Sequence, residues 1–177
     1  MDLRHTAVKE LYLHENSITN GSAFFSNDLL FCSIRELYLA SNPMGELKNC
    51  QFRTGTIRVL SLVSCDIASL VNVVFDAECV YLNDNPLSIV KNVTFQNVKF
   101  VAMVNCGITW DIFKTWKAQI IWMPADHKLI KWSLFRNPLQ WTDLRANHYF
   151  MPPWLSTITL SDGDYHGPIY EKWLQLR

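Results

Sequence analysis

An eleven-residue pattern, L-x-x-L-x-L-x-x-N-x-L, recurs along the chain and constrains its fold more than any other feature of the sequence. The clearest copies run from Val8 to Ile18 and from Ile34 to Met44. In all seven copies together, the ninth positions are residues 16, 42, 65, 85, 106, 137 and 163, at steps of 26, 23, 20, 21, 31 and 26 residues. We therefore expect one domain, residues 1–177, built from about seven repeats.

The fourth and sixth positions of each copy are apolar and two residues apart, so both side chains face the core from one short strand. Stacking the copies then gives a parallel sheet. The strands are expected near 10–14, 36–40, 59–63, 79–83, 100–104, 131–135 and 157–161.

The ninth position carries asparagine in four copies, namely Asn16, Asn42, Asn85 and Asn137. Their side-chain amides are suited to satisfy backbone groups where each strand turns. Cys65 and Cys106 hold the same position and are expected to be buried, free thiols.

The long step predicts an insertion at residues 109–128, and its aromatic residues favour a packed helical or irregular segment. A C-terminal cap is expected at 163–177, where Tyr170 and Trp173 add bulk. The first copy shows no cap, so we expect the chain to be a fragment or to have lost a leader.

Over nearly its whole length the chain resembles the leucine-rich-repeat superfamily, and residues 87–95 resemble the extracellular "typical" repeats. The resemblance implies an α/β fold: a right-handed, curved leucine-rich-repeat solenoid with a parallel sheet on its concave face and an irregular or short-helical convex side. Phe25, Phe52, Phe75 and Phe95 would pack under that convex side.

Charge and hydropathy exclude several function classes. Sixteen basic residues balance sixteen acidic ones without clustering, which argues against nucleic acid as a partner. No apolar stretch approaches the roughly 20 residues that span a bilayer, so we expect no membrane insertion. The start of the sequence also lacks the pattern of a secretory signal.

No catalytic or metal-binding motif is present, so we expect no enzyme activity, no cofactor and no metal. Phosphate-loop, dinucleotide, hydrolase-elbow and zinc-protease strings are absent, and no two histidines have the spacing of a helical metal site. Asp162 and Asp164 fit a turn better than a calcium site. No Cys-x-x-Cys pair occurs, and disulfide pairing among Cys32, Cys50 and Cys79 stays open.

Two sequons make Asn20 and Asn92 candidate glycosylation sites, although about two such matches are expected by chance. We expect an extracellular or secreted protein, with a cytoplasmic one as the alternative.

The odd positions of each strand would point away from the core and form a binding face. The candidate ligand-binding residues on this face are Tyr12, His14, Glu36, Tyr38, Val63, Tyr81, Asn83, Phe100 and Phe135. Aromatic side chains dominate interface energetics, but tyrosine also suits any pleated surface. The acidic residues Glu10, Glu15 and Glu36 would favour a basic patch on a protein partner.

The sequence therefore predicts a non-catalytic protein-binding module, part of an extracellular recognition, adhesion or innate-immune protein, with a protein ligand and a possible homodimer through the uncapped end. One alternative is an intracellular adaptor or scaffold of the same fold. A second is a non-catalytic targeting subunit of an enzyme complex.

Overall fold

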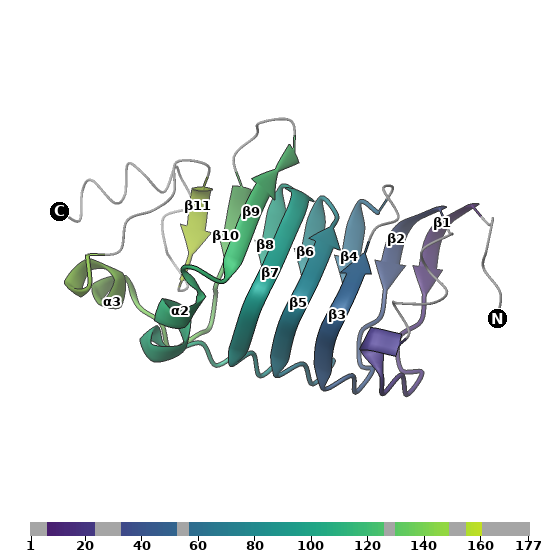
Figure 1. Cartoon of the computed structure of the whole chain (residues 1–177), viewed down its shortest axis with the longest axis horizontal. Coiled ribbons are helices and arrows are strands. Elements are labelled where there is room, and N and C mark those ends of the chain that lie inside the picture. Colours follow the sequence, from purple (N-terminus) through teal and green to yellow (C-terminus); the bar gives the residue numbers. More distant parts are fainter. Residues whose placement is uncertain (1–6, 24–32, 53–56, 126–129, 149–154, 161–177) are drawn as a thin grey trace.

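The computed structural model describes residues 7–23, 33–52, 57–125, 130–148 and 155–160, and within them parallel strands predominate and helices are few (Figure 1). The strands are β1 (Ala7–Tyr12), β2 (Ser33–Tyr38), β3 (Glu46–Phe52), β4 (Val59–Ser61), β5 (Ser69–Asp76), β6 (Cys79–Tyr81), β7 (Ile89–Val98), β8 (Phe100–Ala102), β9 (Ile120–Pro124), β10 (Ile130–Ser133) and β11 (Leu155–Thr159). The helices are α2 (Trp110–Trp116) and α3 (Trp141–Ala146).

The strands form two parallel sheets, and Figure 1 shows their strands side by side along the long axis of the molecule. The larger sheet has the order β1-β2-β4-β6-β8-β10-β11, and the smaller has the order β3-β5-β7-β9. Every strand of the smaller sheet lies in the sequence between two neighbouring strands of the larger one. The chain therefore alternates between the sheets over most of its length.

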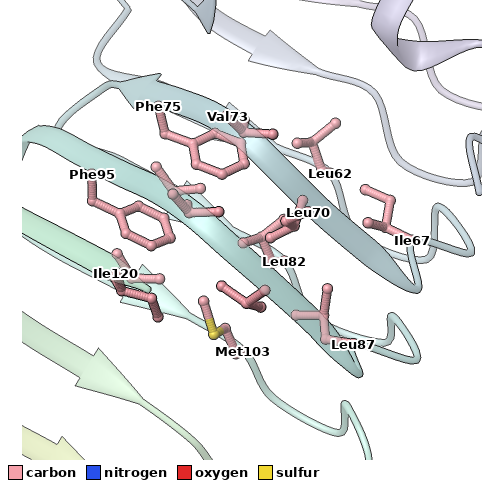
Figure 2. Close-up of a cluster of buried hydrophobic side chains, with 14 of the residues drawn as sticks. Leu62, Ile67, Leu70, Val73, Phe75, Leu82, Leu87, Phe95, Met103 and Ile120 are labelled. Atoms are coloured by element: carbon pink, nitrogen blue, oxygen red, sulfur yellow. The ribbon is translucent and has the colours of Figure 1, made fainter. Parts of the chain in front are cut away.

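Apolar side chains from both sheets meet in one core. Leu37, Leu60, Val80 and Val101 occupy one row of the larger sheet, and each is fully buried. Figure 2 shows side chains from the two sheets in a single cluster, with Leu82 and Met103 from one side and Phe75 and Phe95 from the other.

The inward face of the smaller sheet carries a continuous stack of aromatic rings. Phe52, Phe75, Phe95 and Trp122 stack in order, with ring centroids 5.1, 5.2 and 4.8 Å apart. The predicted burial of Phe52, Phe75 and Phe95 is thus confirmed, whereas Phe25 lies outside the described residues. Each ring lies opposite its neighbour in the strand register, so the stack fixes the pairing of β3, β5, β7 and β9.

The ninth-position residues of the pattern tie successive turns together, as predicted. The Asn85 Oδ1 atom accepts hydrogen bonds from the backbone N–H groups of Cys65 and Ile67, and its Nδ2 atom donates to the carbonyls of Leu62 and Leu82. Asn42, two copies earlier, and Asn137, two copies later, make the equivalent bonds. Cys65 and Cys106 are buried and free, and their thiols donate to the Leu39 and Leu82 carbonyls.

The predicted fold class is wrong. We expected a curved leucine-rich-repeat solenoid with one sheet and an irregular or short-helical convex side, but the described residues form two parallel sheets and show no closed solenoid. The reason lies in the segments between the pattern copies. These segments are extended, place apolar side chains on one face, and pair with one another as the smaller sheet.

The larger-sheet strands overlap all seven predicted strand windows, and several begin and end earlier than expected. The insertion at 109–128 contains α2, which starts at the Thr109 cap and buries Phe113 and Trp116, followed by β9. The expected cap at 163–177 lies outside the described residues.

Candidate functional site

The outward face of the larger sheet carries the candidate ligand-binding residues in two registered rows. The strand register aligns Glu10, Glu36, Val59, Cys79, Phe100 and Lys131 in one row. It aligns Tyr12, Tyr38, Ser61, Tyr81, Ala102 and Ser133 in the other. Parallel strands lie about 4.8 Å apart, so neighbours in a row are close enough for ring contacts.

Tyr12 and Tyr38 form a rigid pair at one end of this face. Their rings are stacked with centroids 4.8 Å apart and planes 5° apart. The Tyr12 hydroxyl donates to Glu10 at 3.0 Å, and the Tyr38 hydroxyl donates to Glu36 at 2.8 Å. Because each tyrosine bonds to the carboxylate two residues earlier on its own strand, both rings are held in the same orientation.

Arg58 completes the second of these bonded pairs. Its Nη2 atom lies 2.9 Å from Glu36 Oε1, while Oε2 accepts the Tyr38 hydroxyl. The hydrogen bond from Tyr38 and then the Arg58 guanidinium lower the pKa of Glu36. The same hydrogen bond is the main reason that the pKa of Tyr38 rises to about 12, so at neutral pH Tyr38 is uncharged and Glu36 is ionised.

A second aromatic group lies near the middle of the face. The Tyr81 and Phe100 rings are 5.6 Å apart and tilted by 57°, and both side chains are half-buried. Ser61 and Ala102 flank Tyr81 in its row and are themselves buried. Small residues therefore alternate with the large ring of Tyr81, which leaves the tyrosine raised above its neighbours.

The seventh-position candidates lie just beyond the strand ends and are spread along the face. The His14 ring meets Tyr12 edge to face at 6.4 Å, so it belongs to the tyrosine pair. Asn83 Oδ1 accepts the Val104 N–H at 2.9 Å, which gives Asn83 a structural role. Val63 and Phe135 are half-buried, and Phe135 lies towards the opposite end of the sheet from Tyr12.

Sequence reasoning found the tyrosines but missed Arg58. The repeated Glu-Leu-Tyr triplet at 10–12 and 36–38 was the signal for the bonded pairs, because residues two apart on a strand share a face. Arg58 belongs to a different repeat from Glu36, 22 residues away, and no local spacing marks that contact.

The two sequon asparagines are both exposed. Asn92 lies on β7, and its Nδ2 atom donates to Asn72 Oδ1 at 2.9 Å. Asn20 Oδ1 accepts the Ala23 N–H at 3.0 Å.

Among the described residues, no group of three or more His, Cys, Asp or Glu side chains is placed to hold a metal ion. Asp162 and Asp164 lie outside them. No helix in the described part of the chain is long and apolar enough to cross a membrane.

Comparisons with known proteins found no relative. No protein-family model, no curated protein and no solved structure matches this chain.

Proposed function

We propose that this protein is a non-catalytic protein-binding module and that its ligand docks on the outward face of the larger sheet. One observation carries the proposal: Tyr12, Tyr38, Tyr81 and Phe100 lie on one face of one sheet, in two close groups. Aromatic side chains with few rotatable bonds lose little entropy on binding and often anchor protein interfaces.

The pre-set orientation of the tyrosine pair supports this proposal. Tyr12 is 55% exposed, although its ring is already stacked on Tyr38 and its hydroxyl is bonded to Glu10. A partner would meet rings that need no reordering, which reduces the cost of association. The resemblance to leucine-rich-repeat recognition proteins, which rests on the repeat pattern, favours the same function.

Affinity capture with mass spectrometry tests the proposal directly. The native protein is compared with the double variant Tyr38→Asp, Tyr81→Asp, which places charge in both aromatic groups. We expect a partner that the native protein retains and the double variant loses. Circular dichroism of the variant establishes that both proteins are folded.

The matched control is the double variant Ile89→Asp, Ile121→Asp on the smaller sheet. These side chains are 56% and 52% exposed, so the substitutions put the same charge on the opposite side of the molecule. The control should keep the partner. A partner lost from this variant but kept by the tyrosine variant would place the binding surface on the smaller sheet instead.

We propose an extracellular location, which the exposed sequon residues Asn20 and Asn92 support. The second candidate function is an intracellular adaptor, and the observation that favours it is the free state of Cys50, Cys65, Cys79 and Cys106. Glycosidase treatment of protein from secreting cells separates the two. A mass decrease that disappears in the double variant Asn20→Gln, Asn92→Gln supports the extracellular protein, and an unchanged mass in both proteins supports the adaptor.

A further inference from the structure

The hydroxyl groups of Tyr12 and Tyr38 offer hydrogen-bond acceptors rather than donors to a ligand on the outward face of the larger sheet. A phenol has one proton to donate, and a glutamate at neutral pH is ionised and can only accept. The Tyr12 proton is directed to Glu10 at 3.0 Å, and the Tyr38 proton to Glu36 at 2.8 Å. Each phenol oxygen therefore has only its lone pairs left for a further partner.

The two phenol oxygens are held side by side. The rings are parallel within 5° and their centroids are 4.8 Å apart. The strand register pairs Tyr12 with Tyr38 and Glu10 with Glu36, so both hydroxyl groups make the same bond on neighbouring strands. A nitrogen donor reaches an oxygen at about 2.9 Å, and one group with several N–H donors can therefore bond to both oxygens at once.

Negative charge acts on both hydroxyl groups. The hydrogen bond to Glu10 is the main reason that the pKa of Tyr12 is raised, and burial and the charges of Glu10 and Glu36 raise it further. The pKa of Tyr38 rises to about 12 mainly through its hydrogen bond to Glu36, with added contributions from burial and from the same two carboxylates. A field that opposes negative charge at these oxygens favours positive charge beside them.

The two cations next to these glutamates contact the other oxygen of each carboxylate. Arg58 Nη2 lies 2.9 Å from Glu36 Oε1, and Lys9 Nζ lies 3.6 Å from Glu10 Oε1, whereas both tyrosines bond to Oε2. Among the described residues, these cations are thus paired with a carboxylate and not with a phenol oxygen. The carboxylate charge is partly neutralised within the protein, so the phenol oxygens are the acceptors that a ligand meets.

We propose that the phenol oxygens of Tyr12 and Tyr38 bind a cationic N–H group of the ligand protein, the guanidinium of an arginine or the ammonium of a lysine. The inference rests on the proposed binding face and specifies the chemistry of one contact on it. Both cations carry several N–H donors and no acceptor, so either can donate to the two oxygens together. A carboxylate or carbonyl group of a ligand would meet only acceptors there and would form no hydrogen bond.

An NMR titration of the full chain with blocked amino acids tests this contact without the ligand protein. The probes are the N-acetyl methylamides of arginine, of lysine and of citrulline, which has nearly the shape of arginine without its charge. We expect a cationic probe to shift the ring signals of Tyr12 and Tyr38 saturably, and the citrulline probe to bind about fivefold or more weakly. The tighter of the two cationic probes identifies the bound group as guanidinium or ammonium.

The double variant Tyr12→Phe, Tyr38→Phe separates the phenol oxygens from the rings. Phenylalanine keeps an aromatic ring at both positions, and Glu10 and Glu36 remain, so the variant measures what the carboxylates bind alone. It should bind the cationic probe about fivefold or more weakly than the native protein, and circular dichroism establishes that it is folded. The control Ser88→Ala removes an exposed hydroxyl just before β7 of the smaller sheet and should bind like the native protein.

Three results would overturn the inference. The first is no saturable binding of either cationic probe up to about 50 mM, which is weaker than a millimolar affinity. The second is equal binding of the citrulline probe, and the third is equal binding by the phenylalanine variant. The proposed function can fail separately, because the probes need no partner. A captured partner that Tyr38→Asp, Tyr81→Asp loses but the phenylalanine variant keeps at full affinity would support the binding face and contradict the cationic contact.

Discussion

The Asn85 side chain makes four buried hydrogen bonds that join two turns, two as acceptor and two as donor. Replacing it with alanine leaves two N–H groups and two carbonyls without these partners in a site where Asn85 is 1% exposed. Each unsatisfied buried group costs about 1–3 kcal/mol, and partial relaxation reduces the sum. We expect Asn85→Ala to lower the free energy of unfolding by about 3–5 kcal/mol in urea titrations.

Asn16→Ala is the matched control for this substitution, because Asn16 holds the same position in the pattern. Asn16 is exposed and its side chain donates to the His14 carbonyl at 2.9 Å, so its loss should change stability by about 0.5 kcal/mol or less. Equal effects of the two substitutions would contradict the connecting role of the buried asparagines.

The buried thiols should make stability fall at alkaline pH. Burial raises the pKa of both Cys50 and Cys106 to about 11, whereas an unfolded thiol titrates near pH 8.5. Between these values the unfolded chain loses protons that the folded chain keeps, so the unfolded state gains stability as pH rises. Stability from these groups is fully present below about pH 8.5 and should decline towards pH 11 by up to about 1.4 kcal/mol per pH unit for each thiol.

Urea titrations at pH 8 and at pH 10.5 measure this decline. Lysine and tyrosine groups also titrate in the range, so the double variant Cys50→Ala, Cys106→Ala provides the comparison. The variant should be less stable at pH 8 and should show a shallower loss on going to pH 10.5. An equal loss in the two proteins would show that the thiols do not account for the alkaline response.

The candidate site was predictable from sequence where its residues follow the strand period. Tyr12, Tyr38, Tyr81 and Phe100 were assigned to one face because alternate residues of a strand share a face, and the register confirms this. The Arg58 contact with Glu36 could not be found in this way. It depends on which strands become neighbours and on the reach of a long side chain between them.

At the scale of elements, the smaller sheet escaped prediction because its strands interrupt their own alternation. Apolar residues that face inward have spacings of three and then two, as in Leu70, Val73 and Phe75. The interruption occurs at Asn72, which has a left-handed backbone with φ of 54°. Asn49 and Asn92 have φ of 53° and 51° at the paired positions of β3 and β7, so a two-residue period is not visible in any of the three strands.

These three asparagines provide a prediction about the smaller sheet. Asn72 accepts a side-chain bond from Asn92 and donates one to Asn49, all on the exposed face. Asn72→Gly loses these exposed bonds but keeps the left-handed backbone, so we expect a loss of about 1 kcal/mol or less. Asn72→Val must also strain a β-branched residue into this conformation and should cost about 1–3 kcal/mol more.

Thermal and urea unfolding of the two variants measure the difference. A valine variant as stable as the glycine variant would show that the left-handed turn does not set the strand geometry. Both substitutions remove the same side-chain hydrogen bonds. The difference in stability between the two variants therefore measures the cost of the left-handed backbone conformation for valine.

At the scale of the whole molecule, the strands lie side by side in a row. Among the described residues, each interior strand of the larger sheet is therefore covered by a neighbour on both sides and β1 by a neighbour on one. Leu60, Val80 and Val101 are fully buried in the middle of the larger sheet, whereas Leu11 in the same row is partly exposed. Local opening follows the number of buried contacts that must be broken. The protein should therefore unfold locally at the β1 end before the middle strands of the larger sheet, β4, β6 and β8, open.

Hydrogen exchange with mass spectrometry tests this order. Peptides from residues 57–106 should exchange slowest, and peptides from residues 7–18 should exchange at least about tenfold faster, a difference of about 1.4 kcal/mol in opening free energy. Two substitutions in the same core row of the larger sheet provide the internal comparison. Leu60→Ala should lower the free energy of unfolding by about 2–5 kcal/mol and accelerate exchange in all strands of the larger sheet, because it leaves a cavity between two buried strands. Leu11→Ala should cost less and accelerate exchange only near β1. If Leu11→Ala instead accelerated exchange in β6 and β8 as strongly as Leu60→Ala, the molecule would unfold as a single cooperative unit, and the β1 end would have no separate stability.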